Sequence, residues 1–161
     1  MGAAESYASV ADADTYLVNR GQTLWATVAL GDKEAALRRA TDYMQVYRER
    51  WSGTRVSATQ ALDWPRAWVP MKDAPGSYGS TPAHYSQTAV PPEVKNACIA
   101  LAFKAAAGDL APDVQPPTIS ETVGSISVSY APGARQTVRY QAIDNMLSPL
   151  LKDGGSGAMV A

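Results

Sequence analysis

The sequence predicts a mainly α protein, a small bundle of four to five helices with a β-hairpin inserted before the last helix and flexible terminal arms. Three observations support this fold class. An apolar stripe recurs every three or four residues between Gly31 and Trp51, as on one face of a helix. Residues 91–108 are apolar on nearly every side of a second helix. Residues 118–130 alternate between β-branched residues and serines, which is typical of strands.

The composition fits a single domain over residues 1–161 with a substantial core. The formal net charge of −1 argues against the broad basic surface of a non-specific DNA-binding protein. Cys98 is the only cysteine and lies in an apolar run, so we expect a buried, unreactive thiol. No secretory signal and no membrane span is recognisable, which predicts a soluble product made in a reducing cytoplasm.

We expect helices through most of residues 9–66. In the first, Ser9 is a good N-cap with Asp12 three positions on, and Gly21 ends the helix. Asp12 and Asp14 could be metal ligands, but capping chemistry is the preferred interpretation because no third oxygen ligand is near in sequence. Trp25 lies in a short helical piece and is predicted to fill the core.

The next predicted helix runs from Gly31 to Trp51, with Asp32 as its N-cap and Gly53 beyond its end. Its buried stripe consists of Leu37, Ala40, Met44, Tyr47 and Trp51. Ser57 followed by Gln60 resembles a capping box and predicts a further helix start, which Pro65 would stop or bend.

The best basic face of the chain lies on this helix. Lys33, Arg38 and Arg39 are the candidates for contact with DNA in a channel, and Arg48 and Arg50 extend the face. The preferred interpretation is a solvated face, because the acids Glu34, Asp42 and Glu49 are spaced to pair with the bases.

The central part of the chain combines a loop and a helix. Residues 69–89 are predicted to form a long loop, which contains the only histidine, His84, in a surface or turn role. Residues 91–108 form the central helix, opened by two prolines and Glu93. Such an apolar helix must be covered by its own domain or by a neighbouring subunit.

The C-terminal part begins with the hairpin at 118–130, which is marginal alone and needs a partner, another chain among the possibilities. A last helix follows at 140–151. Residues 152–161 are a glycine-rich flexible arm whose apolar tip could dock into a partner, and a plain disordered terminus is the alternative.

Recognisable catalytic chemistry is missing from the sequence. There is no glycine-rich phosphate loop, no Gly-x-Ser-x-Gly elbow and no His-Glu-x-x-His motif. We therefore predict no catalytic residue, no bound metal, no cofactor and no enzymatic activity.

Four segments in order resemble one group of small tailed-phage proteins. The strongest is Ala61-Leu62-Asp63-Trp64-Pro65-Arg66, preceded by the helix EAALRRATDY. Ser6-Tyr7 with the acidic run before Tyr16, and Glu121 with Val123-Gly124-Ser125-Ile126, flank them. Members are often labelled DnaT-like single-stranded-DNA-binding proteins, and they also resemble the head–tail adaptor (connector) proteins encoded near portal and capsid genes.

The adaptor resemblance implies a structural virion protein that forms a homo-oligomeric, dodecameric ring below the portal protein. The ring would extend the DNA channel without sequence-specific binding and dock a head-completion, stopper or tail protein. Its place is the virion neck, after assembly in the host cytoplasm, without membrane contact. Candidate subunit or portal contacts are Tyr78, Tyr85, Ile126, Val128, Tyr130, Met159 and Val160.

The family motif is assigned a structural role. It comprises Trp51, Gly53, Gln60, Leu62, Trp64, Pro65 and Arg66. Trp51, Trp64 and Trp68 are expected to pack in the core or at corners, and Arg66 to fix the turn by binding backbone carbonyls.

The alternative function is a DnaT-like single-stranded-DNA-binding replication protein. It calls for aromatic platforms in a basic groove, which Tyr43, Tyr47 and Trp51 with nearby arginines could supply. The near-neutral charge and the core positions of Tyr47 and Trp51 argue against it. A tail-terminator-like virion protein is a third, weaker hypothesis.

Overall fold

The computed structural model describes residues 5–74, 83–112, 120–123, 126–129 and 138–152. Its helical body contains α1 (Val10–Val18), α2 (Leu30–Tyr43), α3 (Pro92–Ala107) and α4 (Gln141–Leu147). Three 3-10 helices extend it: η1 (Thr23–Thr27), η2 (Met44–Arg50) and η3 (Ser148–Leu150). The predicted mainly α fold is therefore confirmed.

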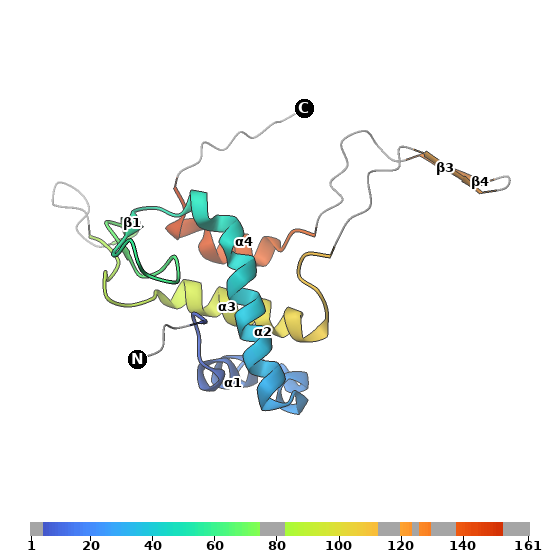
Figure 1. The fold of residues 1–161 in the computed structure, drawn as a ribbon, viewed down its shortest axis with the longest axis horizontal. Helices are drawn as coiled ribbons and strands as arrows, with labels where there is room; N and C mark the ends of the chain where they lie inside the picture. Colours follow the sequence, from blue (N-terminus) through green and yellow to red (C-terminus); the bar gives the residue numbers. More distant parts are fainter. Residues whose placement is uncertain (1–4, 75–82, 113–119, 124–125, 130–137, 153–161) are drawn as a thin grey trace.

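Helix α2 crosses α3 at the centre of the body, with α1 near one end of α2 and α4 near the other (Figure 1). The predicted stripe of α2 and η2 is buried, and Trp25 and Trp51 are 1% and 0% exposed. Helix α1 begins with the expected capping box, in which Ser9 and Asp12 each bind the other's backbone amide.

The apolar helix α3 is covered by its own chain. It packs against α2, α4 and α1. Its buried residues are Val94, Ala97, Cys98, Ile99, Leu101, Ala102 and Ala105. Of the two ways to cover this helix that the sequence left open, burial within one domain is the one observed.

Two short antiparallel pairs complete the fold. Strands β1 (Thr54–Arg55) and β2 (Arg66–Ala67) pair beside the helical body. Strands β3 (Ser120–Val123) and β4 (Ile126–Ser129) form the predicted hairpin, with Val123 opposite Ile126. Figure 1 shows this hairpin well outside the group of helices.

Three local predictions were wrong. The helix expected from Gly31 to Trp51 changes to 3-10 geometry after Tyr43, whose three-residue turn keeps Met44 and Tyr47 on the buried side. Its N-cap is Ala29, so Asp32 lies in the first turn instead.

The third error concerns the expected helix start at Ser57. The Ser57 amide does donate to the Gln60 side chain, 3.0 Å away, but no helix follows. The Gln60 side-chain amide binds the carbonyls of Leu62 and Pro65, at 2.7 and 3.1 Å. These bonds hold a turn in place of the first turn of a helix.

Within the described residues, no helix combines the length and apolar character needed to cross a membrane.

Candidate nucleic-acid interface

A groove of about 500 Å³ lies where the end of α2 and η2 meet the start of α4. We call it the Tyr–Arg groove, because three tyrosines and two arginines dominate its lining. Its residues are Tyr43, Val46, Tyr47, Arg50, Val138, Arg139, Tyr140 and Asp144. The helical period places Tyr43 and Tyr47 on successive turns, and the chain returning to α4 supplies the opposite wall.

The aromatic rings of the groove differ in accessibility. Tyr43 and Tyr140 are half-buried and meet edge to face, with ring centroids 5.5 Å apart. The Tyr140 hydroxyl donates to the Leu110 carbonyl at 3.2 Å, which fixes that ring. Tyr47 is buried, so its ring supports the groove and offers little surface to a ligand.

Asp144 organises the polar side of the groove. Its carboxylate accepts hydrogen bonds from the Tyr47 hydroxyl at 2.7 Å and from the Arg139 Nε at 2.6 Å. Burial alone would raise the pKa of Asp144, but these two donors outweigh it and the pKa is lowered. Burial, followed by the Asp144 carboxylate, raises the pKa of Tyr47. Arg50 lies 5.6 Å from the Tyr47 ring.

The predicted basic face of α2 is largely neutralised. Lys33 binds the Asp14 carboxylate at 2.9 Å, and only 11% of its side chain is exposed. Arg38 pairs with Glu5 at 2.7 Å and with Glu34 at 3.5 Å. These pairs keep both cations from forming an open basic stripe. The hydrogen bond from Lys33 and, less strongly, that from the Trp25 indole lower the pKa of Asp14, although burial acts in the opposite direction.

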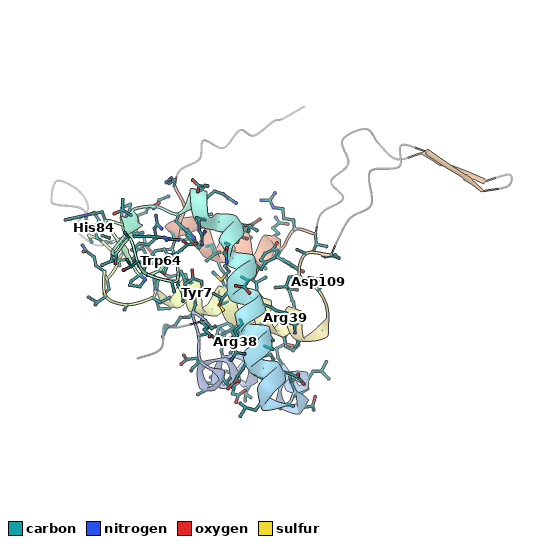
Figure 2. All side chains as sticks on the ribbon, viewed as in Figure 1. Tyr7, Arg38, Arg39, Trp64, His84 and Asp109 are labelled. Carbon is teal, nitrogen blue, oxygen red and sulfur yellow. The ribbon has the colours of Figure 1, made fainter. Side chains whose placement is uncertain are left out.

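Arg39, in contrast to Lys33 and Arg38, lines a hollow together with Tyr43. It is exposed on α2 and lines a smaller pocket with Tyr43, near Asp109 (Figure 2). Of the three residues proposed for a DNA channel, it therefore lies nearest the Tyr–Arg groove, because Tyr43 lines both hollows.

The family motif folds into a compact unit, which we call the Arg66 module, residues Trp51–Ala67. The Arg66 guanidinium donates to the carbonyls of Ser52 and Gly53, each at 2.8 Å, and to that of Asp63 at 3.4 Å. These are the backbone bonds expected of Arg66. Burial lowers its pKa, although the nearby Asp63 carboxylate opposes this effect.

Asp63 is the second buried charge of the module, with 2% of its side chain exposed. Its carboxylate pairs with Arg48 at 3.1 Å and with Arg55. Its amide donates to the Tyr7 hydroxyl at 3.1 Å, which ties the N-terminal segment to the module. In the sequence, Asp63 stands out only as part of the family motif, and no local pattern indicates this role.

The predicted packing of the tryptophans is correct for two of the three. Trp51 and Trp64 are buried and meet edge to face, with centroids 5.5 Å apart. Trp68 is 66% exposed and has a φ of 61°, so the prediction of core or corner packing was wrong for this residue. Its ring contacts His84 at 5.7 Å.

Most proposed interface residues lie where the structure gives no side-chain description. Tyr78, Tyr130, Met159 and Val160 fall outside the described residues, and Ile126 and Val128 are described only as backbone in β4. Tyr85 is half-buried, and its hydroxyl donates to Glu93 at 3.4 Å. Its ring packs against the core, so little of it is free for a partner.

The described residues hold no group of three or more metal-ligating side chains. Cys98 is buried as predicted, and burial raises the pKa of its thiol. Fold and groove together define a small, mainly α protein with a surface hollow lined by tyrosine and arginine.

Comparison with models of protein families identifies the family to which this chain belongs. A model described as "Putative DnaT-like ssDNA binding protein" matches residues 1–161, so the chain belongs to that family. No curated protein matches it. No solved structure matches it either. The family description agrees with the alternative function predicted from the sequence and says nothing of a head–tail adaptor.

Proposed function

We propose that this chain binds single-stranded DNA through the Tyr–Arg groove and carries out no catalysis. The observation that carries the proposal is the grouping of Tyr43, Tyr140, Arg50 and Arg139 around one open hollow. Aromatic rings beside cations are the usual means of holding single strands without reading their sequence. The family description, which covers the whole chain, supports the same ligand.

The two kinds of side chain have separate roles in this proposal. Tyr43 and Tyr140 offer half-exposed rings on which bases stack. Arg50 and Arg139 contact the phosphates that join those bases. Arg139 is exposed on its outer side, so a phosphate can approach while the Nε remains bonded to Asp144.

The charge distribution limits how such binding responds to salt. The net charge is −1, and Lys33, Arg38, Arg48 and Arg55 are paired with carboxylates. Two phosphate contacts give a slope of log K against log salt of about −1.4, from roughly 0.7 per contact on single strands. We therefore expect weak binding with a shallow salt dependence.

The test is fluorescence anisotropy with a labelled oligothymidine at several salt concentrations. The full chain is expected to bind, and a variant carrying Arg50→Gln with Tyr43→Ala to lose at least tenfold in affinity. The matched control is Arg20→Gln, two residues after the end of α1, where the guanidinium stacks on Tyr16 away from the groove. Absence of binding by the full chain, or equal losses in both variants, refutes the proposal.

The second candidate is the head–tail adaptor: a ring-forming virion protein that sits below the portal, extends the DNA channel and docks a stopper or tail protein. The observation in its favour is the β3–β4 hairpin, drawn apart from the helices in Figure 1. A lone two-stranded hairpin is marginal in water, so strand addition from a neighbouring copy would stabilise it. The burial of α3 within one chain removes the other argument for obligatory neighbours.

The mass of the oligomer in solution distinguishes the DNA-binding function from the head–tail adaptor function. Mass photometry of the purified chain, alone and mixed with the portal protein, is expected to reveal rings if the adaptor role is correct. Replacing Val123 and Ile126 by lysine should then abolish ring formation without lowering the helix content. A monomer that stays free of the portal but binds oligothymidine supports the first proposal alone.

A further inference from the structure

Trp68 is held by backbone fixed on both of its sides. Before it, β2 pairs with β1, so that Ala67 lies opposite Thr54. After it, Val69 is fully buried and its carbonyl accepts from the Tyr85 amide at 2.9 Å. One residue further, Pro70 forms a bridge with His84. This frame leaves the ring of Trp68 with little freedom to fold back into the core.

The backbone of Trp68 adopts a conformation that costs free energy. A φ of 61° lies in the left-handed region, which bulky residues rarely enter. The result is a side chain that points outward, 66% exposed, although the other three tryptophans are at most 2% exposed. The chain therefore retains a strained backbone at the one tryptophan whose indole is displayed to solvent.

The surroundings of Trp68 favour a small planar ligand over a protein partner. The His84 ring stands perpendicular to the indole, at 89° and 5.7 Å, and forms one wall beside it. Among the described residues, the exposed large apolar side chain nearest to Trp68 along the sequence is Val56, which follows β1. A protein interface needs a contiguous patch of roughly 800 Å² on each partner. One indole and one imidazole are too few for that, but they match the size of a nucleobase.

We infer that Trp68 and His84 form a stacking platform for a nucleobase of single-stranded DNA, separate from the Tyr–Arg groove. The inference rests on the proposed DNA-binding function and adds a second contact point to it. Trp68 and the groove share no lining residue, so a strand that engages both would have two separate points of contact. Stacking needs only the face of the base, so this contact carries no sequence preference.

Tryptophan fluorescence provides a direct readout, because Trp68 is the one described tryptophan open to solvent. Titration of the full chain with unlabelled oligothymidine is expected to quench part of the emission. In Trp68→Phe the quenching disappears while most of the affinity remains. In Trp68→Ala the affinity falls about 5- to 150-fold, the range that stacking of one base gives. Val56→Ala, at an exposed valine outside the platform, is expected to change neither.

The outcomes distinguish this inference from the proposed function. If the full chain binds no oligonucleotide, the proposed function fails and the platform fails with it. If the full chain binds and Trp68→Ala binds equally well, the platform alone is refuted. If Trp68→Ala changes the oligomer mass and leaves the DNA affinity unchanged, the surface contacts protein, which also overturns the inference. An unchanged thermal midpoint confirms that each variant is folded.

Discussion

The helical body and the Arg66 module are stabilised in different ways. In the body, apolar side chains fill the space between α2 and α3, and Leu101, Ile99 and Met44 are at most 2% exposed. In the module, two buried charged residues, Asp63 and Arg66, hold the chain through ion pairs and bonds to backbone carbonyls. The body depends on burial of apolar area, and the module depends on satisfied polar groups.

The difference matters because the two kinds of contact tolerate change differently. An apolar core accepts side chains of similar volume with modest losses. A buried charge that loses its partners leaves polar groups without hydrogen bonds, which no similar-sized apolar residue restores. Substitutions of matched size in the two regions therefore test the comparison directly.

The largest loss of stability is expected from a substitution in the helical body. Leu101 on α3 is fully buried, so Leu101→Ala should lower the free energy of unfolding by about 4 kcal/mol. Leu101→Met keeps the volume and should cost less than about 1.5 kcal/mol. Urea denaturation followed by circular dichroism measures both. Equal losses from the two variants would contradict the claim that this region depends on volume.

Arg66→Met tests the module with a side chain of similar length. It leaves the Ser52 and Gly53 carbonyls without their donor, and we expect a loss of about 3 kcal/mol. Arg66→Lys keeps the charge but cannot reach both carbonyls with a planar fork, so it should recover only part of the loss. If Arg66→Met proves as stable as the original chain in urea denaturation, the module is held by packing instead.

A smaller loss of stability is expected from a substitution at Gly53, where the chain passes close to β2. Its φ is 65°, and an added Cβ would collide with the Ala67 carbonyl. Gly53→Ala should therefore cost about 2 kcal/mol through strain and local displacement. Gly21→Ala is the matched control, because Gly21 has a φ of 71° but open space around it. The difference between their thermal midpoints isolates the collision from the strain.

The sequence was sufficient for the parts of the molecule that follow a helical period. The buried stripe from Leu37 to Trp51, the capping box at Ser9 and the apolar α3 all come from local patterns, because each reflects contacts a few residues apart. The expected helix after Ser57 failed for the opposite reason. Gln60 bonds to carbonyls further along the chain, and spacing alone cannot distinguish that from a helix cap.

The candidate sites were predicted less completely. Tyr43, Tyr47 and the nearby arginines were named as a possible aromatic and basic surface, but the other wall of the groove comes from residues almost a hundred positions later. Trp68 was expected to pack in the core or at a corner, and its left-handed backbone has no signal in the neighbouring residues. Both features arise from tertiary contacts that a local pattern does not encode.

The smallest expected effect is a loss of stability at alkaline pH. It concerns the hydrogen bond between Tyr7 and the Asp63 amide of the Arg66 module. Burial raises the pKa of Tyr7 to about 12, compared with 10.0 for an exposed tyrosine. The unfolded chain therefore loses this proton first, and the stabilisation is present below pH 10 and lost as the pH rises towards 12. At pH 11 the loss is about 1 kcal/mol. Tyr7→Phe removes the acceptor of the Asp63 amide and lowers stability at neutral pH, but its stability should fall less steeply between pH 9 and 11 in urea denaturation. Parallel pH curves for the two proteins would show that the Tyr7 hydroxyl ionises as readily in the folded chain as in the unfolded one.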